Sequence, residues 1–219
     1  IQQPANKVTF NSITNNPNIG DERNFVGIRE VGSANTWYDN MNVQPDKTYI
    51  VRMYVHNNAA DNLNLVAQNV TAKFNMPTTT GKSIEVNGFV NSTNASPVEV
   101  YDNAFFKSDK DFNLNYQEGS LKFENNVFGA AGTPISESVF TSAGAKLGYD
   151  KLDGKIPGCF KYAGYLSFIV KPQFAQTATF DFHKQVRKTG DTNWSKSVNA
   201  NPGDSVDFQL DYKNTSAIQ

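Results

Sequence analysis

Apolar residues recur at every second position in much of this chain, which is typical of β-strands with one buried face. The clearest run is 48–56, where the large apolar residues are Tyr49, Val51, Met53 and Val55. Arg52 and His56 fall on the opposite face of the same segment. The pattern therefore predicts a strand that covers a core with one face only.

Further segments are short, rich in β-branched and aromatic residues, and bounded by Gly, Pro, Asn or Asp. They are 63–74, 83–90, 98–101, 112–116, 121–124, 165–171 and 177–183. Only 134–147 has room for one or two helical turns, with Ser136 or Ser138 as a cap. These patterns predict the all-β fold class and, within it, a β-sandwich.

The most informative pattern is an internal repeat. Residues 37–59 align without a gap with residues 194–216. Identical residues occur at Trp37 and Trp194, Asn42 and Asn199, Pro45 and Pro202, and Asn57 and Asn214. The apolar positions of the strand also match, because Val206, Phe208, Leu210 and Tyr212 alternate as in the first copy. Residues 29–32 and 187–190 extend the match upstream with a one-residue shift, so we interpret the two segments as copies of one unit.

The order of a Trp, a Pro-containing turn, an alternating strand and a final Asn resembles the tandem conserved-repeat β-sandwich domain of bacterial surface proteins. That family continues with an Asn-Val segment that ends in a proline, which residues 69–77 match in the first copy. The resemblance covers about 37–77 and 194–219. It implies immunoglobulin-like units in a secreted or cell-surface protein, and it brings no catalytic residues.

The predicted organisation has three parts. An extended amino-terminal segment at 1–20 precedes an elaborated immunoglobulin-like β-sandwich at 21–177, and 178–219 are the opening strands of a second related unit. Because a whole unit needs more strands to close its sheet, either a longer chain continues the second unit or a neighbouring molecule completes it by strand addition. In the second case the segment 1–20, with a possible strand at 7–10, is the candidate donor.

Charge and cysteine content exclude several classes. Twenty basic and 21 acidic residues give a net charge of -1, which provides no field to attract nucleic acid. No apolar run reaches the length of about 18 residues that a membrane span needs. Cys159 is the single cysteine, so no internal disulfide is possible.

Motifs for catalysis are missing from the sequence. There is no zinc-protease motif, P-loop or nucleophile elbow, and His56 and His183 have no third member to form a triad. We therefore predict a protein that is not an enzyme and requires no cofactor. A glycoside-active enzyme is the least favoured hypothesis, since its paired carboxylates can be distant in sequence.

Calcium is the one metal that the sequence suggests. Asp150 and Asp153 lie three residues apart before a glycine, and hard cations prefer such oxygen ligands. A solvated Asp-Gly turn is the alternative interpretation.

Similarity to bacterial surface domains also suggests covalent cross-links. Lys184 lies at the start of the second copy, where an isopeptide lysine would lie, and Cys159 could form a thioester with Gln173 or Gln176. The alternatives are a lysine at a strand edge and a small buried thiol.

Aromatic residues supply a candidate glycan site at Trp37, Tyr38, Tyr101 and Phe105, with Phe106 beside them and core packing as the alternative. The function predicted first is a non-catalytic, secreted or cell-surface bacterial structural or adhesive module. It acts by tandem display or by strand-addition assembly into fibres, and its partners are neighbouring copies or adjacent repeats. The alternative is a carbohydrate-binding module, with or without a calcium requirement, whose partner is a surface glycan.

Overall fold

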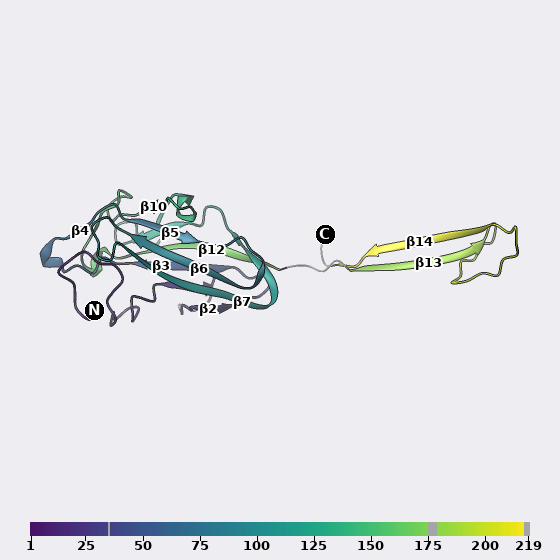
Figure 1. Ribbon diagram of the computed structural model, residues 1–219, viewed down its shortest axis with the longest axis horizontal. Coiled ribbons are helices and arrows are strands. Elements are labelled where there is room, and N and C mark those ends of the chain that lie inside the picture. The colour runs from purple at the N-terminus through teal and green to yellow at the C-terminus, as the bar shows by residue number, and fades with distance from the viewer. Residues whose placement is uncertain (35, 175–178, 217–219) are drawn as a thin grey trace. The chain divides into compact units, whose positions relative to one another are not determined.

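The computed structural model describes residues 1–34, 36–174 and 179–216, and it divides into two compact units, Ile1–Phe174 and Ala175–Gln219. In the described ranges the secondary structure consists of strands and three short 3-10 segments, without an α-helix (Figure 1). The predicted all-β class is therefore confirmed. The predicted boundary between 177 and 178 lies outside the described residues.

The first unit is built on a ten-stranded sheet. Its main path runs β1 (Val26–Glu30), β3 (Tyr49–Val55), β12 (Gly164–Phe174), β7 (Glu99–Tyr116), β6 (Gly81–Asn91), β5 (Thr71–Asn75) and β10 (Ala145–Lys146). Beside this path, β2 (Asn40–Asn42) pairs with β7, and β8 (Lys122–Asn125) pairs with β12 and with β9 (Thr133–Pro134). A small separate sheet joins β4 (Val66–Ala67) to β11 (Ile156–Pro157). The 3-10 segments are Asp61–Leu63, Glu137–Phe140 and Phe160–Tyr162.

Most of the predicted strands occur near their predicted positions. The segment 48–56 forms β3, and 63–74 divides into β4 and β5. The segments 98–101 and 112–116 are the two ends of one strand, β7, because β6 pairs with it along most of its length. The predicted helical turn is the 3-10 segment Glu137–Phe140, and the Ser136 hydroxyl caps it by accepting the N–H of Ser138 at 3.2 Å.

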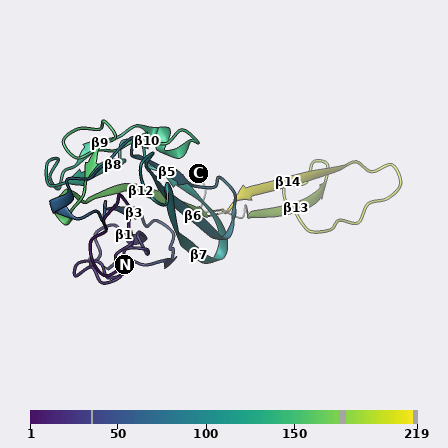
Figure 2. The ribbon, with the colours of Figure 1, turned by 60° about the vertical axis from the view of Figure 1, so that its left-hand side comes forward.

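The ten-stranded sheet bends at β12, where the pairing partner changes, and its two parts form facing layers. The first half of β12 pairs with β8 and its second half pairs with β7, and β1, β3 and β12 lie side by side in one layer (Figure 2). Tyr49 on β3 meets Phe106 on β7 edge to face, with ring centroids 6.1 Å apart. Where β1 crosses β6, a Cβ added to Gly88 would lie 2.7 Å from Cγ2 of Val26, so only glycine allows the layers to approach this closely.

Residues 1–20 differ from the separate extended segment that the sequence predicted. Val8, Phe10 and Ile13 are buried, and the segment belongs to the same compact unit as the sheet. The N–H of Ala5 donates to the carbonyl of Asn58 at 2.8 Å, and the N–H of Asn11 donates to the carbonyl of His56 at 3.1 Å. These contacts occupy the predicted donor strand within its own unit, which corrects that part of the strand-addition hypothesis.

A buried polar network fastens this segment. Glu22 is 0 % exposed and His56 is 1 % exposed, and His56 Nδ1 lies 2.9 Å from Glu22 Oε1. The amide groups of Asn16 and Asn58 donate to the two carboxylate oxygens at 2.7 Å and 2.6 Å. A buried carboxylate destabilises a fold unless it is hydrogen-bonded in this way. The network therefore fixes the amino-terminal segment against the end of β3.

Replacement of Glu22 by Ala should leave His56 and two asparagine amides without their shared acceptor. We expect the free energy of unfolding to fall by about 3–5 kcal/mol, measured by urea denaturation. Amide hydrogen exchange at Ala5 and Asn11 should accelerate in the same variant. Asp21→Ala is the control, because its ion pair with Arg23 is exposed to solvent and contributes little to stability; equal effects of the two variants would contradict the role given to the network.

The second unit is an antiparallel hairpin of β13 (Phe180–Lys188) and β14 (Val206–Asn214). Its pairing reproduces that of β1 and β3. We call β1 and β3 the first hairpin, and β13 and β14 the second hairpin. In the first hairpin Ile28 pairs with Val51 and forms a bridge with Tyr38. In the second, Val186 pairs with Phe208 and forms a bridge with Ser195, at the positions that the sequence alignment makes equivalent.

Side chains and turns of the two hairpins also correspond. The guanidinium carbon of Arg29 lies 4.8 Å from the Trp37 ring centroid, and that of Arg187 lies 4.4 Å from the Trp194 ring centroid. In the turn before the second strand of each hairpin, Asp46 has φ 62° and the equivalent residue Gly203 has φ 96°. Glycine adopts this left-handed region without strain.

An ion pair occupies the same place in both hairpins with its charges exchanged. Lys47 Nζ lies 2.7 Å from Glu30 Oε1 in the first hairpin. Lys188 Nζ lies 3.0 Å from Asp204 Oδ2 in the second. In each case the pair joins the end of the first strand to the turn that precedes the second strand.

Candidate functional site

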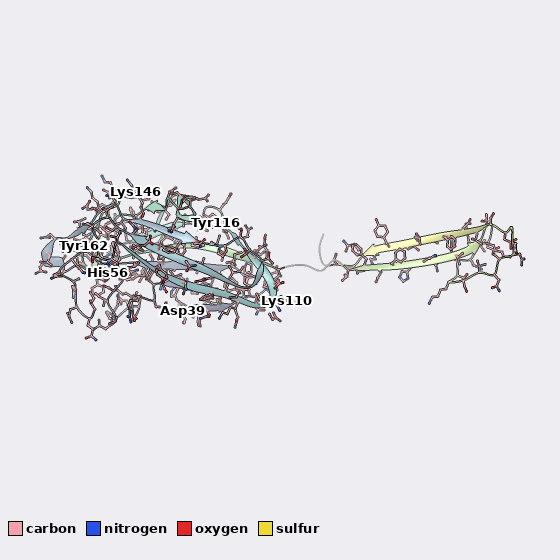
Figure 3. All side chains as sticks on the ribbon, in the orientation of Figure 1. Asp39, His56, Lys110, Tyr116, Lys146 and Tyr162 are labelled. Atoms are coloured by element: carbon pink, nitrogen blue, oxygen red, sulfur yellow. The ribbon has the colours of Figure 1, made fainter. Side chains whose placement is uncertain are left out.

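The candidate site lies where the chain crosses from one layer of the first unit to the other. After β1, Tyr38 forms its bridge with Ile28, and the chain then enters β2, which pairs in parallel with β7. The backbone of Asp39 lies between these contacts, and its carbonyl accepts the N–H of Phe105 on β7 at 2.7 Å. Asp39 is exposed at the surface of the first unit (Figure 3).

Two pockets adjoin at this crossing. The first has a volume of about 330 Å³ and is lined by residues of β1, β3 and the crossing segment, among them Trp37 and Arg52. The second has a volume of about 520 Å³ and is lined by Asp102 and Phe105 of β7, among others. Asn24 and Asp39 line both pockets. We call the two together the crossing groove.

Trp37 is half-buried and lies over the outer face of β1 at Gly27. A Cβ added to Gly27 would be 3.1 Å from the Cβ of Trp37, so a larger residue would require Trp37 to shift by a few tenths of an ångström. The absence of a side chain at Gly27 therefore leaves room for the Trp37 ring to lie against β1.

Arg52 links Trp37 to the next aromatic ring. Its guanidinium carbon lies 3.8 Å from the Trp37 ring centroid and 4.4 Å from the Tyr165 ring centroid. Burial is the main cause that lowers the pKa of Arg52 to about 10, so the side chain remains positively charged at neutral pH. Across the described residues, no hydrogen bond or ion pair holds this guanidinium. A partly buried cation of this kind has N–H donors left for a ligand in the first pocket.

The acidic residues at the other end of the groove have local partners. Arg23 forms a bidentate contact with Asp21, with Nη2 and Oδ2 2.5 Å apart, and this contact lowers the pKa of Asp21. The Asp102 carboxylate accepts the N–H groups of Phe25 and Val26 at 2.6 Å and 2.8 Å. Asp102 thus ties the start of β1 to β7.

Two of the four predicted aromatic residues meet at the groove. Trp37 lines the first pocket and Phe105 lines the second. Tyr38 is 48 % exposed and lines neither. Tyr101 is 68 % exposed and packs against Phe89, with ring centroids 5.9 Å apart. Phe106 is a core residue, as its alternative interpretation stated.

The loop predicted to bind calcium has the contacts of a turn. Asp153 Oδ1 accepts the N–H of Lys155 at 3.1 Å, and Lys151 Nζ lies 3.9 Å from Asp153 Oδ2. Within 1–34, 36–174 and 179–216, no group of three or more His, Cys, Asp or Glu side chains could hold a metal ion. The structure thus brings no further acidic ligand to Asp150 and Asp153.

The residues predicted to form cross-links make ordinary contacts. Lys184 lies on β13 with its amine 4.7 Å from the Phe208 ring centroid. Cys159 is partly buried, and its N–H donates to the carbonyl of Asn57 at 3.3 Å. Gln176 lies outside the described residues. These contacts add no support to the isopeptide or thioester hypothesis.

Sequence reasoning missed the polar members of the groove, Arg52, Asp39, Asn24 and Asp102. Only Arg52 gave a signal, because it interrupts the outer face of a strongly alternating strand. The others are brought together by pairing between strands that are distant in sequence.

Comparisons with protein-family models, curated proteins and solved structures found no match to this chain. The resemblance to bacterial surface domains therefore rests on the sequence pattern alone. In the part of the chain that the structure describes, no helix has the length and hydrophobicity of a membrane-spanning segment.

Burial raises the pKa of Asp102 above its usual value, with the nearby charge of Asp39 acting in the same direction. The ionised carboxylate therefore lowers the stability of the folded state relative to the protonated form. We expect wild-type protein to gain stability relative to Asp102→Asn as the pH falls from 7 through the raised pKa, and to have gained it fully below the ordinary value of 3.8. Urea denaturation of both proteins at a series of pH values measures this, and a difference that does not change with pH would refute it.

Proposed function

We propose that this chain is a non-catalytic structural or adhesive module of a secreted or cell-surface bacterial protein. In this proposal the first unit is an elaborated immunoglobulin-like β-sandwich, and β13 and β14 open a second related unit. The observation on which the proposal rests is the uncovered apolar face of the β13–β14 hairpin.

Large apolar side chains point to one face of this hairpin and are exposed. Phe180 and Phe182 on β13 are 60 % and 64 % exposed, and Phe208, Leu210 and Tyr212 on β14 are 58 %, 60 % and 78 % exposed. A two-stranded hairpin is marginally stable by itself. Full burial of one such side chain would contribute about 1.5–3 kcal/mol, so a covering partner would stabilise the unit substantially.

The first hairpin indicates what the second hairpin lacks. Tyr49, Val51, Met53 and Val55 of β3 take the places of the apolar residues of β14, and all are at most 1 % exposed. They are covered by the facing layer, and β12 pairs with the edge of β3 that β1 leaves open. The matching register of the two hairpins supports a second unit that is completed in the same way.

The occupant that fits is a set of β-strands from another unit of this kind. One strand would run antiparallel to β14, in the place that β12 takes beside β3, and its apolar residues would cover the hairpin. In assembly, a neighbouring copy provides these strands; in tandem display, an adjacent repeat provides them.

Sedimentation of the chain over a concentration series tests assembly between copies. We expect the wild-type sedimentation coefficient to rise with concentration, and Leu210→Ser to require at least about tenfold higher concentration for the same association. Asp211→Ser is the matched control, because Asp211 lies next to Leu210 on the opposite face of β14. A wild-type monomer at every concentration would overturn strand addition between copies.

One observation favours carbohydrate binding as a second function. Trp37 and Phe105, two of the aromatic residues that the sequence predicted for a glycan site, line adjoining pockets. Aromatic side chains and a few directed polar groups are the usual composition of a small-ligand pocket.

A further inference from the structure

We propose that the crossing groove binds a saccharide that carries a carboxylate, and that Arg52 binds the carboxylate. This inference rests on the second function proposed above and names the chemical class of the sugar.

Arg52 is a cation prepared for an anionic ligand. It is positively charged at neutral pH, it lines the first pocket, and its described contacts are with the rings of Trp37 and Tyr165. Aromatic rings attract the charge but leave the N–H groups of a guanidinium without acceptors in its plane. A carboxylate satisfies two of these donors at once, with the geometry that arginine prefers.

The second hairpin provides an internal reference for the site. Its Arg187 and Trp194 reproduce the contact of Arg29 with Trp37, so that contact belongs to the framework which both hairpins share. Gln209 takes the place of Arg52 in the matching strand. The cation is therefore an addition to the framework in the first unit.

Other pocket-lining positions differ in the same way. Gly27, on which Trp37 lies, corresponds to Gln185, and Tyr54 corresponds to Asp211. The pairing register and the arginine–tryptophan contact are thus matched between the two hairpins, whereas Arg52, Gly27 and Tyr54 of the pocket are not. This pattern is expected if the pocket has a function of its own.

The rest of the groove suits the body of a sugar. Its two parts measure about 330 Å³ and 520 Å³, within the usual range of roughly 300–1,000 Å³ for small-ligand sites. The planar polar groups of Asn24 and Asp39 line both parts and can bond to hydroxyl groups. The ion pair of Asp21 and the backbone donors to Asp102 reduce the repulsion that these carboxylates would exert on an acidic ligand.

The test compares a uronic-acid tetrasaccharide with its carboxyl-reduced, neutral counterpart. Isothermal titration measures affinity, and the indole N–H signal of Trp37 in NMR spectra reports the place of binding. We expect the full chain to bind the acidic tetrasaccharide more tightly, and Arg52→Gln to weaken that binding by about 10- to 100-fold. The same variant should leave the affinity for the neutral sugar nearly unchanged.

Matched variants separate charge from folding. Lys146→Gln removes one exposed positive charge outside the groove and should bind as wild type does. Arg52→Lys keeps the charge but loses the bidentate geometry, so its affinity should lie between those of wild type and Arg52→Gln. This variant keeps the test decisive if Arg52→Gln does not fold.

The remaining outcomes are distinguishable. Equal binding of both tetrasaccharides, unaffected by Arg52→Gln, would overturn the role of the carboxylate and leave carbohydrate binding standing. Binding of neither would overturn both proposals for the groove. A short acidic peptide that binds at the Trp37 signal as tightly as the acidic tetrasaccharide would show that the site selects a carboxylate without a sugar, which would also overturn the inference.

Discussion

The alternation of side chains along β3 is the constraint on which the core and the crossing groove both depend. The inward positions, such as Val51 and Met53, pack between the layers. On the opposite face, Arg52 lies over the ring of Trp37, and His56, directly after β3, contacts the buried carboxylate of Glu22. A shift of one residue in the pairing of β3 would exchange the two sets, so register, core and groove are determined together.

The two hairpins separate what the fold requires from what the first unit adds. Pairing register, the arginine over the tryptophan and the left-handed turn residue occur in both. The differences concern the outer face, where Arg52 stands in the first hairpin and Gln209 in the second. A framework that tolerates such exchanges can carry different outer faces without a change in its core.

Local patterns predicted most strands and the turn beside Pro45, because period-two alternation and turn chemistry act over a few residues. The groove was less predictable. Asp102 bonds to Val26 across 76 positions of sequence, and no local rule places β7 beside β1. The same limit applies to the amino-terminal segment, since its burial depends on Glu22, a carboxylate that the sequence alone presents as an ordinary surface charge.

The exchanged ion pairs also bear on how two similar hairpins fold correctly in one chain. If β1 paired with β14, Glu30 would meet Asp204, and if β13 paired with β3, Lys188 would meet Lys47. Each mispaired sheet would replace an attraction between opposite charges with a repulsion between like charges. The opposite order of the two charges thus favours the pairing of each strand with its own partner over pairing with the corresponding strand of the other hairpin.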